Sequence, residues 1–138
     1  MPTSFIPISI PDATTYTILA RNSGLVHYFP DFSSTCVATL PTPKAGMNFE
    51  FAYNGLAADA ANFTIDSGSD TYYFKGGLAF LDTDDAIAVI AGDGNSNSKM
   101  TIVVPSTGTR FRVESTDGTT WNVSGFVHSA TVPSFADQ

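Results

Sequence analysis

The sequence predicts an all-β fold: a single-domain antiparallel sandwich or small barrel of about 8–12 short strands, with an extended N-terminal arm. Apolar and polar residues alternate within several short runs, and Gly, Pro, Asn and Asp residues separate those runs. Charged residues make up only 14% of a chain that is 43% hydrophobic. A length of 138 residues suits one domain. We therefore divide the chain into an arm at residues 1–12 and a single β domain at residues 13–138.

The N-terminal arm contains four large apolar residues, Phe5, Ile6, Ile8 and Ile10, interspersed with prolines. Proline removes a donor from a β-ladder, which confines such a segment to a sheet edge or a surface. Two interpretations stay open. The arm is either an edge strand of the chain's own sheet or a segment that packs on a neighbouring subunit. In the second case these four residues are the candidate contacts with the other subunit or partner.

The next part of the chain alternates between apolar runs and turn residues. Residues 16–21 and 25–29 flank Asn22-Ser23-Gly24, a combination that favours a hairpin because Asn and Gly tolerate positive φ. Residues 34–40 form the following expected strand. In residues 47–53, Met, two Phe and Tyr occupy alternate positions, so one face of that strand is expected to enter the core.

The central part of the chain is less regular. Residues 54–61 are rich in alanine and are expected to form a loop or a short helix. Gly76-Gly77 is expected to separate two strands, and residues 92–98 are expected to form a polar loop. The strands expected here are residues 63–66, 72–74, 78–81 and 86–91.

The C-terminal third, residues 99–127, contains three apolar runs, and the last two alternate around Asp117-Gly118. This period-two pattern predicts an antiparallel hairpin with one buried face and one exposed face. Trp121 should be the largest apolar anchor, since a buried indole removes a large area from water. The residues expected to anchor the core are Phe49, Phe51, Phe111, Val113, Trp121 and Val123.

Composition argues against several classes of function. A net charge of −7, with only six Lys and Arg residues, disfavours binding to nucleic acid or to an anionic membrane surface. No run approaches the ~18–20 apolar residues that span a bilayer, and the N-terminus lacks the basic region of a signal peptide. We therefore expect synthesis in a reducing cytoplasm. Cys36, the single cysteine, lies among small apolar residues and is interpreted as a packing residue.

Two acidic segments are candidates for a metal or an acid–base site. Residues 93–97 begin like a calcium loop, but Ser98 and Val104 occupy the positions that require Gly and Glu. Residues 82–85 group three carboxylates, a pattern more typical of a solvated turn. We interpret both segments as polar turns, and we expect no bound metal and no cofactor.

No catalytic residues are assigned, and the sequence does not indicate an enzyme. His27 and His128 are the only histidines, and neither has a ligand partner at the spacing of a zinc site. No nucleophile elbow, phosphate-binding loop or dinucleotide motif occurs. Tyrosines and Trp121 could stack on sugar rings, although packing in the core is the more typical role.

Several fragments, taken in order, resemble small β-rich phage virion proteins, namely head-decoration proteins and tail-fibre modules. In those proteins a Thr-Leu-Pro segment precedes an Ala-Gly turn and a strand with alternating Phe, and a Ser-Asp-Gly-Thr turn precedes Trp-x-Val-Ser-Gly. Here Thr116 intrudes between Ser115 and Asp117. The matching fragments are residues 15–19, 22–24, 37–43, 45–51, 62–65, 67–68 and 117–125.

The resemblance implies a structural virion component, usually a homotrimer, with no catalytic residues. A capsid decoration or cement protein, bound to the major capsid protein on the outer surface of a phage head, is favoured by the acidic charge and the apolar arm. The chain also has no collagen-like or coiled-coil shaft. The alternative is a tail-fibre or receptor-binding module that recognises a glycan on the host surface.

Overall fold

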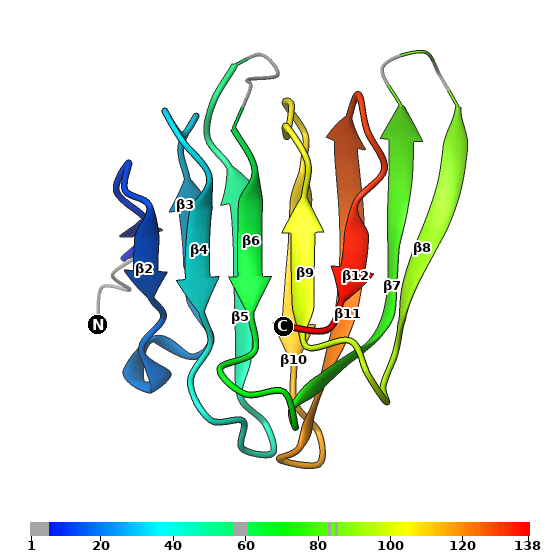
Figure 1. Ribbon diagram of the computed structural model, residues 1–138. Helices are drawn as coiled ribbons and strands as arrows, with labels where there is room; N and C mark the ends of the chain where they lie inside the picture. Colours follow the sequence, from blue (N-terminus) through cyan, green and yellow to red (C-terminus); the bar gives the residue numbers. More distant parts are fainter. Residues whose placement is uncertain (1–5, 57–60, 83, 85) are drawn as a thin grey trace, which may run out of the picture.

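Two β-sheets pack face to face, with the core between them (Figure 1). This architecture confirms the all-β prediction and is a sandwich rather than a barrel. Phe5 and part of the alanine-rich segment lie outside the described residues, as do two positions of the acidic segment 82–85. The computed structural model describes residues 6–56, 61–82, 84 and 86–138.

Most strands are short, but β7 and β11 have ten residues each, and η1 (Ala20–Asn22) is a single 3₁₀ turn. In spatial order, the seven-stranded sheet contains β1 (Ile8–Ser9), β3 (Val26–Phe29), β5 (Asn48–Tyr53), β10 (Arg110–Glu114), β11 (Thr120–Ser129), β7 (Tyr73–Asp82) and β8 (Ile87–Asp93). The five-stranded sheet contains β12 (Ser134–Ala136), β9 (Lys99–Ile102), β6 (Phe63–Asp66), β4 (Cys36–Thr39) and β2 (Thr15–Thr17).

The path of the chain explains why both sheets are mixed, where the sequence predicted antiparallel sheets. From β1 to β7, successive strands alternate between the two sheets, so that neighbours such as β3 and β5, or β4 and β6, run parallel. Consecutive strands within one sheet, β7–β8 and β10–β11, pair antiparallel. The pairs β5–β10, β6–β9 and β9–β12, which are distant in the chain, are antiparallel as well. The hairpin predicted at residues 22–24 is instead a crossing between the sheets, because β2 and β3 belong to different sheets.

Aromatic side chains fill the space between the sheets. Phe63 of β6 stacks on Phe29 of β3 with ring centroids 4.4 Å apart, and it lies 5.9 Å from Phe51 of β5. Trp121 is fully buried, 6.0 Å from Phe49. Each such ring contributes about 1.5–3 kcal/mol by leaving water. All the expected core anchors are buried: Phe49, Phe51, Phe111, Val113, Trp121 and Val123.

β7 continues without a break through Gly76 and Gly77, where the sequence predicted a turn. These glycines allow close packing rather than a reversal of the chain. A Cβ atom on Gly76 would lie 2.4 Å from the carbonyl oxygen of Val123 in β11, and Gly76 has a φ of +90°. β7 and β11 therefore pair in this register because position 76 carries no side chain.

The N-terminal segment joins the chain's own fold from Ile8 onward. Ile8 and Ser9 form β1, which pairs in parallel with β3 at the edge of the sheet. Ile10 is only 3% exposed and belongs to the core. The pairing of β1 matches the first of the two interpretations, an edge strand of the chain's own sheet. Contact of this segment with another subunit stays a prediction, with Ile10 buried in the core and Ile8 half-buried. Ile6, at 65% exposure, is free to contact a partner.

His27 is a buried ionisable side chain that packs against the rings of Phe49 and Phe51. Its Nδ1 atom donates a hydrogen bond to the carbonyl oxygen of Leu25 at 3.2 Å. Its Nε2 atom has no hydrogen-bond partner among the described residues. Burial therefore lowers the pKa of His27 below its ordinary value, although the hydrogen bond to Leu25 opposes the shift.

Acidification should destabilise the chain through His27. The pKa of His27 is lower in the folded chain than its unfolded value of about 6.5. The free energy of unfolding is therefore not reduced by His27 above that pH, and it decreases as the pH falls toward the folded pKa. The slope should reach at most ~1.4 kcal/mol per pH unit. Urea unfolding between about pH 7.5 and 5 measures this slope, which His27→Phe should reduce and His128→Gln should retain. An unchanged slope in His27→Phe would contradict this assignment.

Candidate docking surface

The residues with catalytic or metal-binding chemistry are dispersed over the fold. Within the described ranges, no three His, Cys, Asp or Glu side chains are grouped as metal ligands. The His27 side chain is buried in the core, whereas His128 lies in β11 with Nδ1 3.1 Å from the carbonyl oxygen of Thr107. The strands β5 and β10 lie between β3 and β11 in the sheet, so the two histidines belong to different environments.

The polar turns that carry aspartates are stabilised by their own hydrogen bonds. Asp93 Oδ1 accepts from the backbone N–H groups of Asn95 and Ser96, both at 2.9 Å, and Oδ2 accepts from Ser96 Oγ at 2.6 Å. These bonds, above all the one from the Ser96 hydroxyl, hold the pKa of Asp93 well below its ordinary value. Asp117 makes equivalent bonds to the N–H and hydroxyl groups of Thr120. Both turns have structural roles that explain their sequences.

Cys36 lies in β4 and is fully buried. Burial, with a smaller contribution from the charge of Asp12, raises the pKa of its thiol to about 11. A thiol with that pKa is protonated at neutral pH and is a poor nucleophile. Cys36 is therefore a packing residue.

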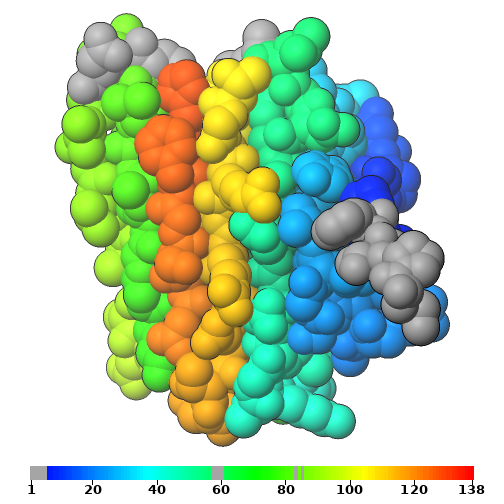
Figure 2. All heavy atoms as spheres, turned by 180° about the vertical axis from the view of Figure 1, so that it is seen from behind, coloured from blue at the N-terminus to red at the C-terminus, as the bar shows by residue number. Residues whose placement is uncertain are grey.

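A shallow depression of about 490 Å³ lies on the outer face of the seven-stranded sheet, over β5, β10 and β11; Figure 2 shows this face. Arg110, Glu50 and Phe126 are among its lining residues. Arg110 Nε donates to Glu50 Oε1 at 2.6 Å, and Arg112 pairs with Glu114 at 2.7 Å. Because both arginines are paired with carboxylates, the depression has little net charge. Exposed pairs of this kind contribute little to stability.

Apolar side chains cover the same outer face where the sheet ends at β8. The register places Phe126 of β11 opposite Ala79 of β7, and Ala79 opposite Val89 of β8. Leu81 pairs with Ile87 in the next row. Ile87 and Val89 are 80% and 74% exposed, and neighbouring exposed aliphatic side chains of this size mark a contact surface. We call Ala79, Leu81, Ile87, Val89 and Phe126 the β8 surface.

β8 is also the longest edge strand in the described part of the chain. The edge strand β1 has two residues, and β2 and β12 have three each, whereas β8 has seven. Residues 87–92 read Ile-Ala-Val-Ile-Ala-Gly and contain neither a charge nor a proline. Natural proteins place charged residues and prolines on edge strands to prevent these strands from pairing with other chains. An unprotected edge beside exposed aliphatic side chains is typical of a surface that another chain covers.

The sequence predicted a strand at residues 86–91 but did not show that it is exposed. Consecutive apolar residues normally indicate a strand buried on both faces. The exposure follows from the position of β8 at the end of the sheet, which depends on the path of the whole chain. The sequence contained a weak indication that this strand is exposed. A polar turn follows directly at residues 93–97, and short aliphatic side chains outnumber aromatic ones in the strand.

No protein-family model and no curated protein matches the chain. None of the described residues forms a helix that is long and apolar enough to cross a membrane. Function is therefore inferred from the surface and the chemistry described above.

Replacing Ile87 and Val89 together by serine should lower the binding of a hydrophobic dye such as ANS while the far-UV circular dichroism stays unchanged. Both side chains project into solvent, so their removal costs little stability. Leu56→Ser is the matched control, because Leu56 is 87% exposed but lies outside the β8 surface. Equal dye fluorescence for the double variant and the unmodified chain would show that the β8 surface is not an accessible apolar patch.

Proposed function

We propose that this chain is a structural virion protein, and more specifically a capsid decoration or cement protein on the outer surface of a phage head. The observation that carries the proposal is the β8 surface: its exposed Ile87 and Val89 lie on an edge strand that has no charge over residues 87–92, in a domain with a net charge of −7. Such an edge is a liability in a free protein and suits a protein that works while attached to another. The resemblance of its turn and strand motifs to phage decoration proteins and fibre modules supports the same role.

One β8 surface provides a weak contact by itself. Burying Ile87 and Val89 is worth about 1.5–3 kcal/mol each, whereas association costs roughly 4 kcal/mol or more in lost rigid-body freedom. A homotrimer offers three such surfaces to a lattice of major capsid proteins. Once one surface binds, the effective concentration of the others reaches about the millimolar range. Attachment to a repeating lattice therefore makes a small apolar surface sufficient.

The charge of the chain favours the outside of the particle. The packaged DNA is a polyanion, so a domain with a net charge of −7 is repelled from the inner surface of a filled head. The paired arginines on the outer sheet face leave few free cations for phosphate groups. An exterior position requires only that the β8 surface meets an apolar counterpart on the capsid protein.

A tail-fibre or receptor-binding module is the second candidate, and the depression beside Phe126 favours it. A partly exposed aromatic ring next to the paired side chains of Arg110 and Glu50 combines a face for a sugar ring with hydrogen-bonding groups for its hydroxyls. On this alternative, Phe126→Ala abolishes binding on a glycan array, whereas Val89→Ser has no effect there. The decoration role predicts no glycan binding by either variant or by the unmodified chain.

Particle binding tests the proposal directly. Gradient-purified particles of the virus that encodes the chain should contain it, and particles depleted of it should bind the purified protein again. The double variant of Ile87 and Val89 to serine should lose at least about tenfold in affinity, because most of the apolar contact is removed. Leu56→Ser should bind as the unmodified chain does.

Two results would contradict this role. One is the absence of the chain from purified particles by mass spectrometry. The other is full re-binding by the double serine variant, since attachment would then use a different surface. Light scattering of the free protein complements these measurements, because a trimer in solution supports the multivalent arrangement.

A further inference from the structure

The open side of β8 presents main-chain hydrogen-bonding groups as well as side chains. Hydrogen bonds of 2.8 Å, from Asp82 N–H to Ala86 O and from Gly94 N–H to Phe74 O, fix its pairing with β7 at both ends. In an antiparallel pair such bonds recur at alternate residues, so the even-numbered residues of β8 bond to β7. The residues whose N–H and C=O groups point to the open side are Ile87, Val89 and Ala91.

No described segment covers this edge. β8 is the last strand of its sheet. Among the described residues, no backbone hydrogen bond outside the strand ladders reaches Ile87, Val89 or Ala91. The seven residues of β8 span about 23 Å. The edge therefore has the length and the free groups to pair with one additional strand.

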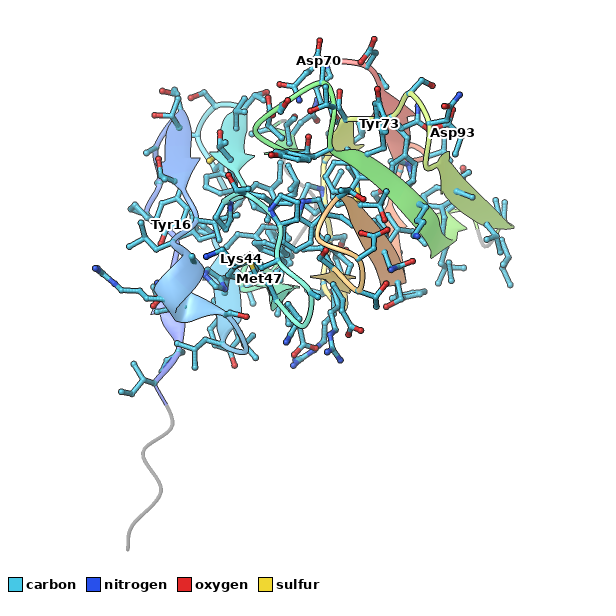
Figure 3. All side chains as sticks on the ribbon, turned by 90° about the horizontal axis from the view of Figure 1, so that it is seen from below. Tyr16, Lys44, Met47, Asp70, Tyr73 and Asp93 are labelled. Atoms are coloured by element: carbon cyan, nitrogen blue, oxygen red, sulfur yellow. The ribbon has the colours of Figure 1, made fainter. Side chains whose placement is uncertain are left out.

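Carboxylates bracket the apolar part of β8. Asp84 is exposed before the strand, and Asp93, labelled in Figure 3, is exposed at its end. Lys75 pairs with Asp93 in register, but its ammonium group lies 3.6 Å from a carboxylate oxygen of Asp117. An added strand with a cationic residue at each end meets a carboxylate at both ends, while its centre meets apolar side chains.

A second copy of this chain is a poor occupant of the same edge. A twofold axis would pair β8 with β8 in antiparallel orientation, which sets the Asp84 end of one copy against the Asp93 end of the other. Like charges opposite each other destabilise a strand pair, and each copy has a net charge of −7. Charge complementarity favours a partner segment of different composition.

We propose that β8 receives an extended segment of the lattice protein as an added strand, apolar in its centre and with Lys or Arg at both ends. This inference rests on the proposed function and specifies how attachment is made. The main-chain groups of Ile87, Val89 and Ala91 hydrogen-bond to the segment, and the side chains of Ile87 and Val89 pack beside its alternate apolar side chains. The seven-stranded sheet thereby continues into the partner.

The first test uses synthetic peptides as probes of the full chain. The reference peptide has about nine residues, enough to extend past both ends of β8, with alternating Val and Thr and a Lys at each end. Fluorescence anisotropy at low salt should show saturable binding. The same peptide with Glu at each end should bind at least about tenfold more weakly. N-methylation at alternate residues, which removes the pairing N–H groups, should cause a similar loss.

Two substitutions of Val89 separate main-chain pairing from side-chain contact. Val89→Pro removes an N–H group on the open side and leaves the hydrogen bonds to β7 in place, a position where strands tolerate proline. Val89→Ser keeps that N–H group and removes the apolar side chain. Val89→Pro should weaken peptide binding by about tenfold or more, and Val89→Ser by less. Thermal unfolding of both variants verifies that they are folded.

Strand addition is overturned if the unmodified chain does not bind the Lys-ended peptide, or if the Glu-ended and N-methylated peptides bind equally well. A dimer of the chain formed through β8 would also overturn it. Particle binding separates this failure from failure of the proposed function. Loss of attachment in Val89→Ser but not in Val89→Pro means that side chains alone make the contact. If both variants attach fully to particles, the β8 surface is not the attachment site, and the proposed function loses the observation that supports it as well.

Discussion

The fold depends on aromatic rings that fill the space between its two sheets. Phe63 from the five-stranded sheet contacts Phe29 and Phe51 from the seven-stranded sheet, so each sheet supplies part of the surface that buries the other. Because side chains alternate along a strand, turning these rings inward fixes which residues face outward. The arginines of β10 lie on the outer face for this reason, as do the exposed aliphatic residues of β8.

The aromatic core does not extend under β8. On the inner side of that strand, Ala88 and Ile90 are only half-buried, and Ala88 packs at the margin of the core. The ladder with β7 is the main contact of β8 with the rest of the molecule. The outward aliphatic side chains therefore contribute little to the fold of the described chain. A contact outside the chain gives a physical reason for their presence.

Sequence patterns predicted the parts of the fold that local chemistry determines. The hairpin of β10 and β11 is encoded by alternation through Phe111 and Trp121 and by the turn at Asp117-Gly118. The strand order was not predictable, because a segment such as Asn22-Ser23-Gly24 can close a hairpin or cross between sheets. The sequence predicted a turn at Gly76-Gly77. The glycines are needed instead for a close approach to β11, a long-range contact that a local pattern does not show. The β8 surface escaped prediction for the same reason.

Hydrogen–deuterium exchange, measured on the free protein and on protein mixed with particles of the proposed virion, shows whether β8 is the attachment site. On binding, we expect slower exchange at the amides of residues 87–92, where those of Ile87, Val89 and Ala91 lack a described backbone acceptor in the free chain. The edge strands β1, β2 and β12 should exchange as before. Protection centred on β1, or on the depression over β10 and β11, with unchanged exchange at β8 would show that the chain attaches through another surface.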